Sequence, residues 1–211
     1  MSEIIIRKNG NHYATDFLNW TDGVDAMLKP NNDAPLPHVL VHVANITSTP
    51  HGIAPAGMLL INPDLKEVPD FFGFICADEE LGKYFGPKIF KGTPFEQAPV
   101  FKADIKIEID FPRNVVAKIS VAGHLCELEL SHFDAAKYYN RDPFPMPFRQ
   151  NVVEAKANSA TFKWDGRILG GELPTTGLGA GLPACYSPTG MYVMRSEERR
   201  VGKECLRLCR S

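Results

Sequence analysis

The sequence has few cysteines and no long apolar run. It contains 5 cysteines among 211 residues, and none of them forms a CxxC pair. This scatter excludes a zinc site of paired cysteines and is more typical of reduced thiols than of a disulfide framework. No stretch reaches the roughly 18 apolar residues of a membrane-spanning helix, and the N-terminus shows no secretory leader. We therefore expect a cytoplasmic protein without a membrane segment.

An excess of charge of one sign is also lacking. The chain carries 23 basic and 25 acidic residues, with a net charge of −2. A mildly acidic protein has no basic surface with which to bind nucleic acid or an anionic membrane. The expected partner is therefore a small molecule, with no nucleic acid and no membrane.

The C-terminal segment differs in character from the rest of the chain. Residues 195–205 read RSEERRVGKEC, which is similar to the translation of a common short-read sequencing adapter. Foreign segments are set aside before a fold is considered. We therefore predict one β-rich domain over residues 1–194, truncated at its native C-terminus, and a non-native tail over residues 195–211.

Strand patterns dominate what is present. Residues 102–109 alternate strictly, which would place Ala103, Ile105, Ile107 and Ile109 on one face of a half-buried strand. Turn signals at residues 122–123 and 165–166 predict two hairpins. The other strands that we expect cover residues 39–44, 58–61, 71–77, 115–121, 124–130, 152–164 and 167–169.

Helix signals are few and short. Thr21 precedes a candidate helix over residues 22–28, and Ser131 with Asp134 has capping-box spacing before residues 135–138. Prolines within residues 142–147 exclude a helix there. We expect an α+β protein that is mostly antiparallel β, with a curled sheet or barrel and few short helices.

The most suggestive chemical pattern is GKYFGPKIF, residues 82–90, in which Lys88 lies among aromatic and aliphatic neighbours. Desolvation disfavours an ammonium, lowers its pKa and frees the amine as a nucleophile. Such an amine forms a Schiff base with a ketone, and the protonated imine withdraws electrons. The alternative is that Lys88 extends from an apolar loop to water without any chemical role.

These residues resemble the acetoacetate decarboxylase superfamily, whose signature is approximately G-R-E-x-x-G-x-P-K-K-L after a buried strand. The matching order here is Glu80-Leu81, then GKYFG over residues 82–86, then PKIF over residues 87–90. The similarity is specific around Lys88 and extends loosely over residues 39–130. Ile89 stands where the family has its second lysine.

The resemblance implies an enzyme that acts on a small β-keto or 2-oxo acid through a Lys88 Schiff base, by decarboxylation or by aldol or dehydration chemistry. It implies that Glu80 positions a water or the lysine, and that Lys91 or Lys83 supplies the cation that lowers the lysine pKa. Tyr84 and Phe85 would contact the substrate. No metal or organic cofactor is required, and a homo-oligomer is expected.

Two alternatives remain open. His38 and His42 are four residues apart, with His51 nearby, but in a strand the first two would lie roughly 13 Å apart, too far to share one zinc ion. Ordinary hydrogen-bonded histidines are therefore favoured over a metal site. The rival to an enzyme is a non-catalytic, calycin-like β-barrel that binds a small apolar ligand.

Overall fold

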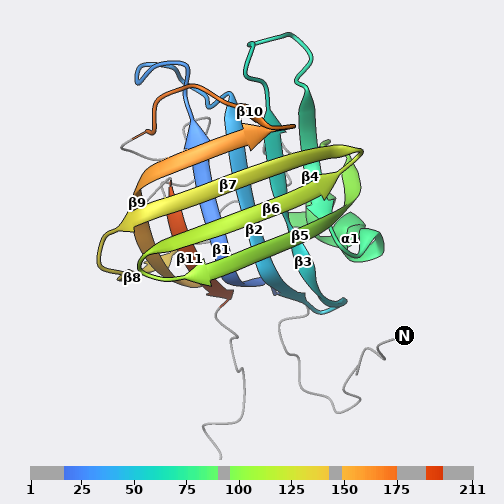
Figure 1. Ribbon diagram of the computed structural model, residues 1–211. Helices are drawn as coiled ribbons and strands as arrows, with labels where there is room; N and C mark the ends of the chain where they lie inside the picture. The colour runs from blue at the N-terminus through green and yellow to red at the C-terminus, as the bar shows by residue number, and fades with distance from the viewer. Residues whose placement is uncertain (1–16, 90–95, 143–148, 175–188, 197–211) are drawn as a thin grey trace, which may run out of the picture.

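The computed structural model describes residues 17–89, 96–142, 149–174 and 189–196, and for residues 85–89 it describes the backbone alone. Eleven strands and one helix lie in these ranges (Figure 1). In chain order they are β1 (Asn19–Leu28), β2 (Val39–Thr49), β3 (Gly52–Ile61), β4 (Phe71–Cys76), α1 (Glu79–Ile89), β5 (Val100–Asp110), β6 (Asn114–Val121), β7 (His124–Phe133), β8 (Lys137–Arg141), β9 (Gln150–Trp164), β10 (Arg167–Ile168) and β11 (Gly190–Ser196).

The strands form one sheet that closes on itself. The order along the sheet is β10-β9-β11-β1-β2-β3-β4-β5-β6-β7, and the pairing of β7 with β9 turns this path into a ring. Among the described strands, every pairing is antiparallel except that of β4 with β5. Parallel neighbours require a crossover connection, and α1 lies in that connection. The expectation of a mostly antiparallel, curled sheet is confirmed.

The ring is flattened into two layers whose strands cross (Figure 1). We call β1–β4, β8 and β11 the rear layer and β5, β6, β7 and β10 the front layer. The long strand β9 belongs to both. Its first half pairs with β11 and β8, and its second half pairs with β7 and β10. One strand therefore turns the corner between the layers on one side, and the parallel pairing of β4 with β5 joins them on the other.

The space between the layers is filled by apolar side chains. Alternate residues of both layers contribute, among them Val41 and Leu59 from the rear layer and Ile105, Ile119 and Phe162 from the front layer. Burial of such side chains contributes about 1.5–3 kcal/mol each. The interior of the ring is therefore a packed core. The predicted alternation of β5 is confirmed for Ala103, Ile105 and Ile107, whereas Ile109 is 39% exposed near the strand end.

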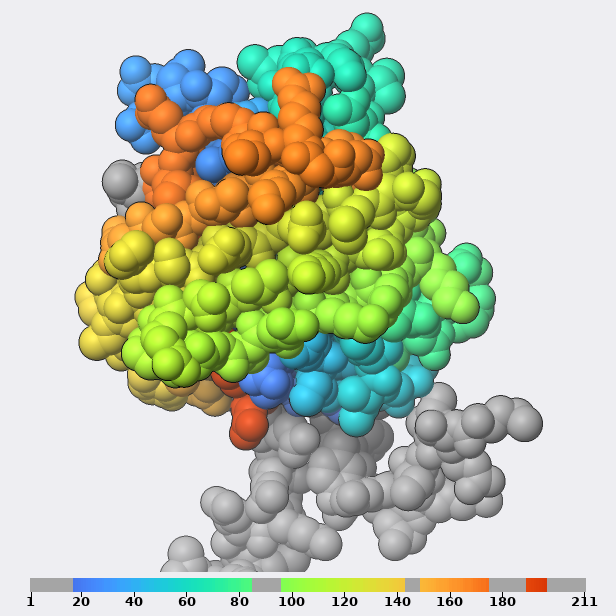
Figure 2. Space-filling model, in the orientation of Figure 1, coloured from blue at the N-terminus to red at the C-terminus, as the bar shows by residue number. Residues whose placement is uncertain are grey.

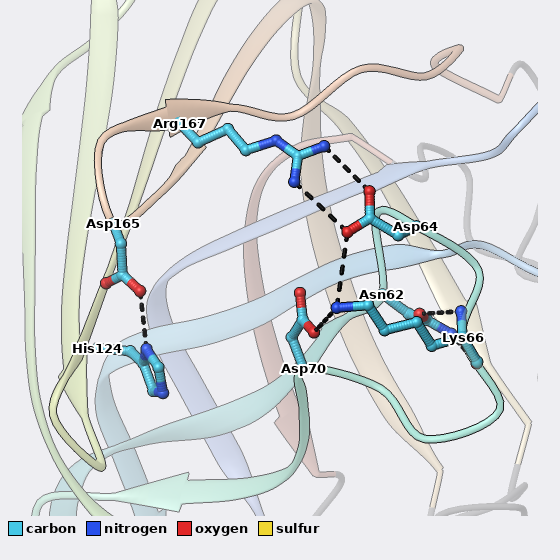
Figure 3. Close-up of polar contacts among 7 residues, drawn as sticks. All are labelled: Asn62, Asp64, Lys66, Asp70, His124, Asp165 and Arg167. Carbon is cyan, nitrogen blue, oxygen red and sulfur yellow. Dashed lines mark hydrogen bonds and ion pairs between the residues drawn. The ribbon is translucent and has the colours of Figure 1, made fainter.

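The segment that follows β9 covers one end of the ring. Figure 2 shows it lying between the loops that join β1 to β2 and β3 to β4. Backbone hydrogen bonds join Lys29 and Glu172 in both directions, and Arg167 donates to Asp64 at 3.0 Å (Figure 3). Leu169 enters the interior core from this segment. The covering segment is thus bonded to two loops of the rear layer.

A second apolar cluster lies on the outer face of the rear layer, which points away from the front layer. Its members include Trp20, Met58, Phe74 and Tyr192 from the strands, and Leu81 from α1. These residues alternate with those of the interior core. The rear layer is therefore buried on both faces, and α1 packs against its outer face next to β3, β4 and β5.

Helix α1 forms in a segment that contains two glycines and a proline. The Asp78 carboxylate accepts hydrogen bonds from the amides of Glu80 and Leu81, at 3.0 and 3.2 Å. This is the pattern of an N-cap, and Glu79 and Glu80 in the first turn favour the positive end of the helix dipole. The cap and the burial of Leu81 offset the poor helix propensity of glycine.

Most of the predicted strands are present, but both predicted helices are wrong. Residues 22–28 belong to β1, which is paired on both sides by β2 and β11. Residues 137–141 form β8, which pairs with β9. In each case pairing with distant strands overrides a local capping pattern. Among the described residues, no helix is long and apolar enough to cross a membrane.

The predicted boundary at residue 194 lies within β11. Arg195 and Ser196 continue this strand and pair with Asn151 and Gln150 of β9. Residues 197–211 of the predicted non-native tail lie outside the described residues.

Candidate functional site

Lys88 lies in the last turn of α1, and its side chain is outside the described part of the protein. Its backbone position follows Leu81 by seven residues and Tyr84 by four. Positions at i, i+3 and i+7 share one face of a helix. Leu81 is 3% exposed and packs on the rear layer. Lys88 therefore occupies the face of α1 that carries Leu81. Lys91 lies outside the described residues.

Glu80 and Lys83 are paired on the exposed side of the same helix. The Lys83 Nζ atom lies 2.7 Å from Glu80 Oε1 and 3.3 Å from Glu79 Oε1. The Glu80 side chain is 83% exposed. The hydrogen bond to Glu80, followed by that to Glu79, raises the pKa of Lys83. Lys83 is therefore held as a cation, and the Glu80 carboxylate is engaged by Lys83.

Tyr84 is half-buried and packs against the cluster on the outer face of the rear layer. Its ring lies against the His51 ring, with ring centroids 3.6 Å apart. His51 belongs to the turn between β2 and β3, so this contact ties α1 to that turn. The side chain of Phe85, which was expected to contact substrate beside Tyr84, lies outside the described residues.

A polar line that the sequence did not predict crosses the outer face of the rear layer. The His42 Nδ1 atom lies 2.5 Å from Asp25 Oδ1, and the Tyr192 hydroxyl lies 3.1 Å from His42 Nε2. The Tyr192 hydroxyl also donates to the carbonyl oxygen of Val43 at 3.2 Å. Asp25, His42 and Tyr192 come from β1, β2 and β11, and we call them the Asp25–His42–Tyr192 line.

The line exists because β1 carries a glycine between its two neighbours. Gly23 is paired with Tyr192 in the sheet. A Cβ atom at Gly23 would lie 2.4 Å from the Tyr192 ring. Without that atom, the ring lies across β1 and reaches His42 on β2. The two rings are nearly parallel, with centroids 4.7 Å apart, and Trp20 packs edge-on against His42 at 4.8 Å.

The hydrogen atoms of this line fit two arrangements. A carboxylate accepts only, so His42 Nδ1 donates to Asp25. With His42 neutral, Nε2 accepts from the Tyr192 hydroxyl. With His42 protonated, Nε2–H donates to the tyrosine oxygen while that hydroxyl donates to Val43. A carboxylate that orients a histidine toward a hydroxyl is the arrangement that enzymes use for proton transfer.

Burial differs along the line. The side chains of Asp25 and His42 are 18% and 12% exposed, whereas Tyr192 is 2% exposed. Burial, followed by the charge of Asp25, raises the pKa of Tyr192 well above its ordinary value. The phenol therefore remains protonated. Asp25 is the end nearer to water, and Tyr192 is the buried end.

Further polar side chains surround Tyr192. Glu154 is its partner on β9, is buried, and accepts a hydrogen bond from the Tyr139 hydroxyl. Arg141 on β8 lies 3.7 Å from the Met194 sulfur through Nη1. Arg141 and Glu154 both act on Tyr192 electrostatically, in opposite directions. The Tyr192 phenol, the Glu154 carboxyl group and the Arg141 guanidinium thus lie close together beside an otherwise apolar cluster.

The three histidines considered for a metal site have separate partners. His38 bonds to the Gly170 carbonyl oxygen at 2.9 Å, His42 to Asp25, and His51 contacts Tyr84. In the described ranges, no group of three His, Cys, Asp or Glu side chains is placed to hold a metal ion. The signal for His42 was its position between buried valines in a strand, but its partner Asp25 becomes evident only from the pairing of β1 with β2.

Comparison with known protein families, with curated proteins and with solved structures finds no match for this chain.

Proposed function

We propose that this protein is a Schiff-base lysine enzyme, similar to acetoacetate decarboxylase, that acts on a small β-keto or 2-oxo acid. The Lys88 amine adds to the substrate ketone, and the resulting iminium drives decarboxylation or a related aldol or dehydration step. The observation that carries this proposal is the position of Lys88 on the face of α1 that packs against the outer face of the rear layer.

The environment under α1 supports an activated amine. Cys76 lies beneath the first turn of the helix, with its Cβ atom 2.9 Å from the position that a Cβ at Gly82 would occupy. Burial raises the pKa of the Cys76 thiol to about 11. A surrounding that disfavours a thiolate also disfavours an ammonium. Desolvation of this kind is what the proposal requires at the Lys88 amine.

Borohydride trapping tests the proposal. The protein is incubated with acetoacetate or pyruvate, reduced, digested and mapped by mass spectrometry. We expect a reduced adduct on the Lys88 peptide, lost in Lys88→Met and retained in Lys118→Met, which removes an exposed lysine of β6. A folded wild-type protein without an adduct on Lys88 would contradict the proposed Schiff-base activity. The result would then favour the non-catalytic β-barrel that binds a small apolar ligand.

A further inference from the structure

Arg141, the last residue of β8, differs from the arginines that form ion pairs. Arg113, Arg149 and Arg167 are exposed, and each lies beside an aspartate, at 2.7, 3.4 and 3.0 Å. Arg141 is partly buried, and no carboxylate of the described ranges lies within ion-pair distance of it. An arginine side chain stays protonated in proteins. Arg141 therefore brings a positive charge to the rear layer without a directly paired carboxylate from the described residues.

The N–H groups of Arg141 have little to bond to in the described part of the chain. A guanidinium carries five N–H donors. The Nη1 atom lies 3.7 Å from the Met194 sulfur, and a thioether is a weak acceptor. The Nε atom is buried and has no hydrogen-bond partner. A buried donor on a charged group is destabilising when it lacks an acceptor, and a native protein that keeps one commonly does so for a bound ion or a function.

The register of β8 determines where this guanidinium lies. Arg141 pairs with Gln150 of β9, and Tyr139 pairs with Val152. Val152 and Met194 belong to the apolar cluster on the outer face of the rear layer, and Tyr139 packs against it. A hydrogen bond between charged groups is stronger beside apolar side chains than in water. Arg141 thus combines a partly exposed cation with surroundings that favour tight binding of an anion.

Glu154 limits the charge that such an anion can carry. Glu154 is 2% exposed and pairs with Tyr192 in the sheet. The charges of Glu154 and Arg141 both act on Tyr192, in opposite directions, so both groups lie near that residue. A ligand with one negative charge balances Arg141. A doubly charged phosphate would in addition be repelled by Glu154.

We propose that Arg141 binds the carboxylate group of a small monocarboxylic acid, whose two oxygen atoms accept parallel hydrogen bonds from the guanidinium. The planar fork of arginine matches the geometry of a carboxylate, which is why this pairing recurs in binding sites. The inference goes beyond the proposed function. It uses residues of β8, β9 and β11 and does not depend on the Lys88 amine.

Calorimetric titration of butyrate into the full chain near neutral pH tests this site. We expect saturable binding by the wild type, and a loss of affinity of about tenfold or more in Arg141→Met, because a hydrogen bond between charged groups is lost. Arg113→Met is the matched control, since Arg113 is exposed and paired with Asp110, and it should bind butyrate as the wild type does. Butanamide, which has the same size and no charge, should bind more weakly than butyrate.

Thermal unfolding separates a binding arginine from a structural one. Arg141→Met removes the unpartnered donor, so without ligand it should melt at or above the wild-type temperature. Butyrate should raise the melting temperature of the wild type and not that of Arg141→Met. Arg141→Lys keeps the charge but not the fork and should also bind butyrate more weakly than the wild type. This variant decides the matter if Arg141→Met does not fold.

Four outcomes would overturn the carboxylate site. They are the absence of saturable butyrate binding by the wild type, wild-type affinity in a folded Arg141→Met or in Arg141→Lys, equal binding of butanamide, and tighter binding of inorganic phosphate than of butyrate. Butyrate has no ketone and cannot form an imine. These results are therefore independent of borohydride trapping on Lys88, and either proposal can fail without the other.

Discussion

Gly23→Ala is the substitution whose effect the structure defines most sharply. The added Cβ would lie 2.4 Å from two atoms of the Tyr192 ring and 2.7 Å from a third. Carbon atoms in contact are separated by about 3.5–4.0 Å, so the ring must move by roughly 1 Å. The Tyr192 hydroxyl already lies 3.1 Å from His42 and 3.2 Å from Val43. A shift of that size breaks both contacts.

The expected loss of stability follows from three contributions. Overpacking a well-packed site costs about 1–3 kcal/mol, and a buried hydroxyl without partners costs about 1–3 kcal/mol. Replacement of glycine lowers the conformational entropy of the unfolded chain, which stabilises the folded protein by about 0.4–1 kcal/mol. We therefore expect Gly23→Ala to lower the free energy of unfolding by about 1–5.5 kcal/mol.

Urea unfolding, followed by the fluorescence of Trp20 and Trp164, measures this change. Gly170→Ala is the control, because a Cβ there meets no atom within 4 Å, and it should leave stability unchanged or slightly raised. In a Tyr192→Ala background the added methyl group meets no ring, so Gly23→Ala should cause little further loss. Equal stability of Gly23→Ala and Gly170→Ala would refute the packing argument.

Two further predictions follow from burial and charge. Burial raises the pKa of Cys76 to about 11 and that of Cys126 to about 12. Iodoacetamide should therefore label neither thiol in the native protein near neutral pH. Labelling at the rate of a free thiol would contradict this prediction. The Leu125 amide, followed by His124, lowers the pKa of Asp165, so its stabilising effect is present at neutral pH and is lost as the pH falls below about 4. The stability difference between wild type and Asp165→Asn should therefore shrink on acidification, and a difference that persists at low pH would show another cause.

The two hairpin turns could be predicted because their residues determine the backbone locally. Ala122 and Gly123 have φ values of 50° and 86°, and Asp165 and Gly166 have 50° and 80°. Positive φ at both central residues is the type I′ turn that short hairpins favour. The strands on either side alternate in burial, so pattern and turn chemistry agreed.

The helices could not be predicted for the opposite reason. The segment around Thr21 has helix-capping residues, but it lies between two partner strands, one of them encoded about 170 residues later along the chain. The segment that does form α1 contains Gly82 and Pro87, which are poor helix formers. Its stability depends on the Asp78 cap and on burial against the rear layer. Local patterns carry neither piece of information.

The candidate site also has one part that the sequence predicts and one part that it does not. Lys88 was identifiable from a local motif, and its backbone position on α1 follows from spacing within one helix. The Asp25–His42–Tyr192 line joins residues that are 17 and 150 positions apart. Its formation requires the register of β1 with β2 and the absence of a side chain at Gly23. Neither condition is visible until the strands are paired.

The position of β11 between β1 and β9 has a consequence for the time course of folding. The meander β5-β6-β7 joins strands that are neighbours along the chain. Its contacts are short in sequence separation, so it can assemble early in folding. The β11 contact is remote: the Leu18 amide donates to the Ser196 hydroxyl across 178 positions. Entry of β11 is therefore a late event. Before it, β1 and β9 each present an unpaired edge, which is the surface through which partly folded chains associate. Refolding yield should accordingly fall as protein concentration rises, although the completed ring has no such edge along β1.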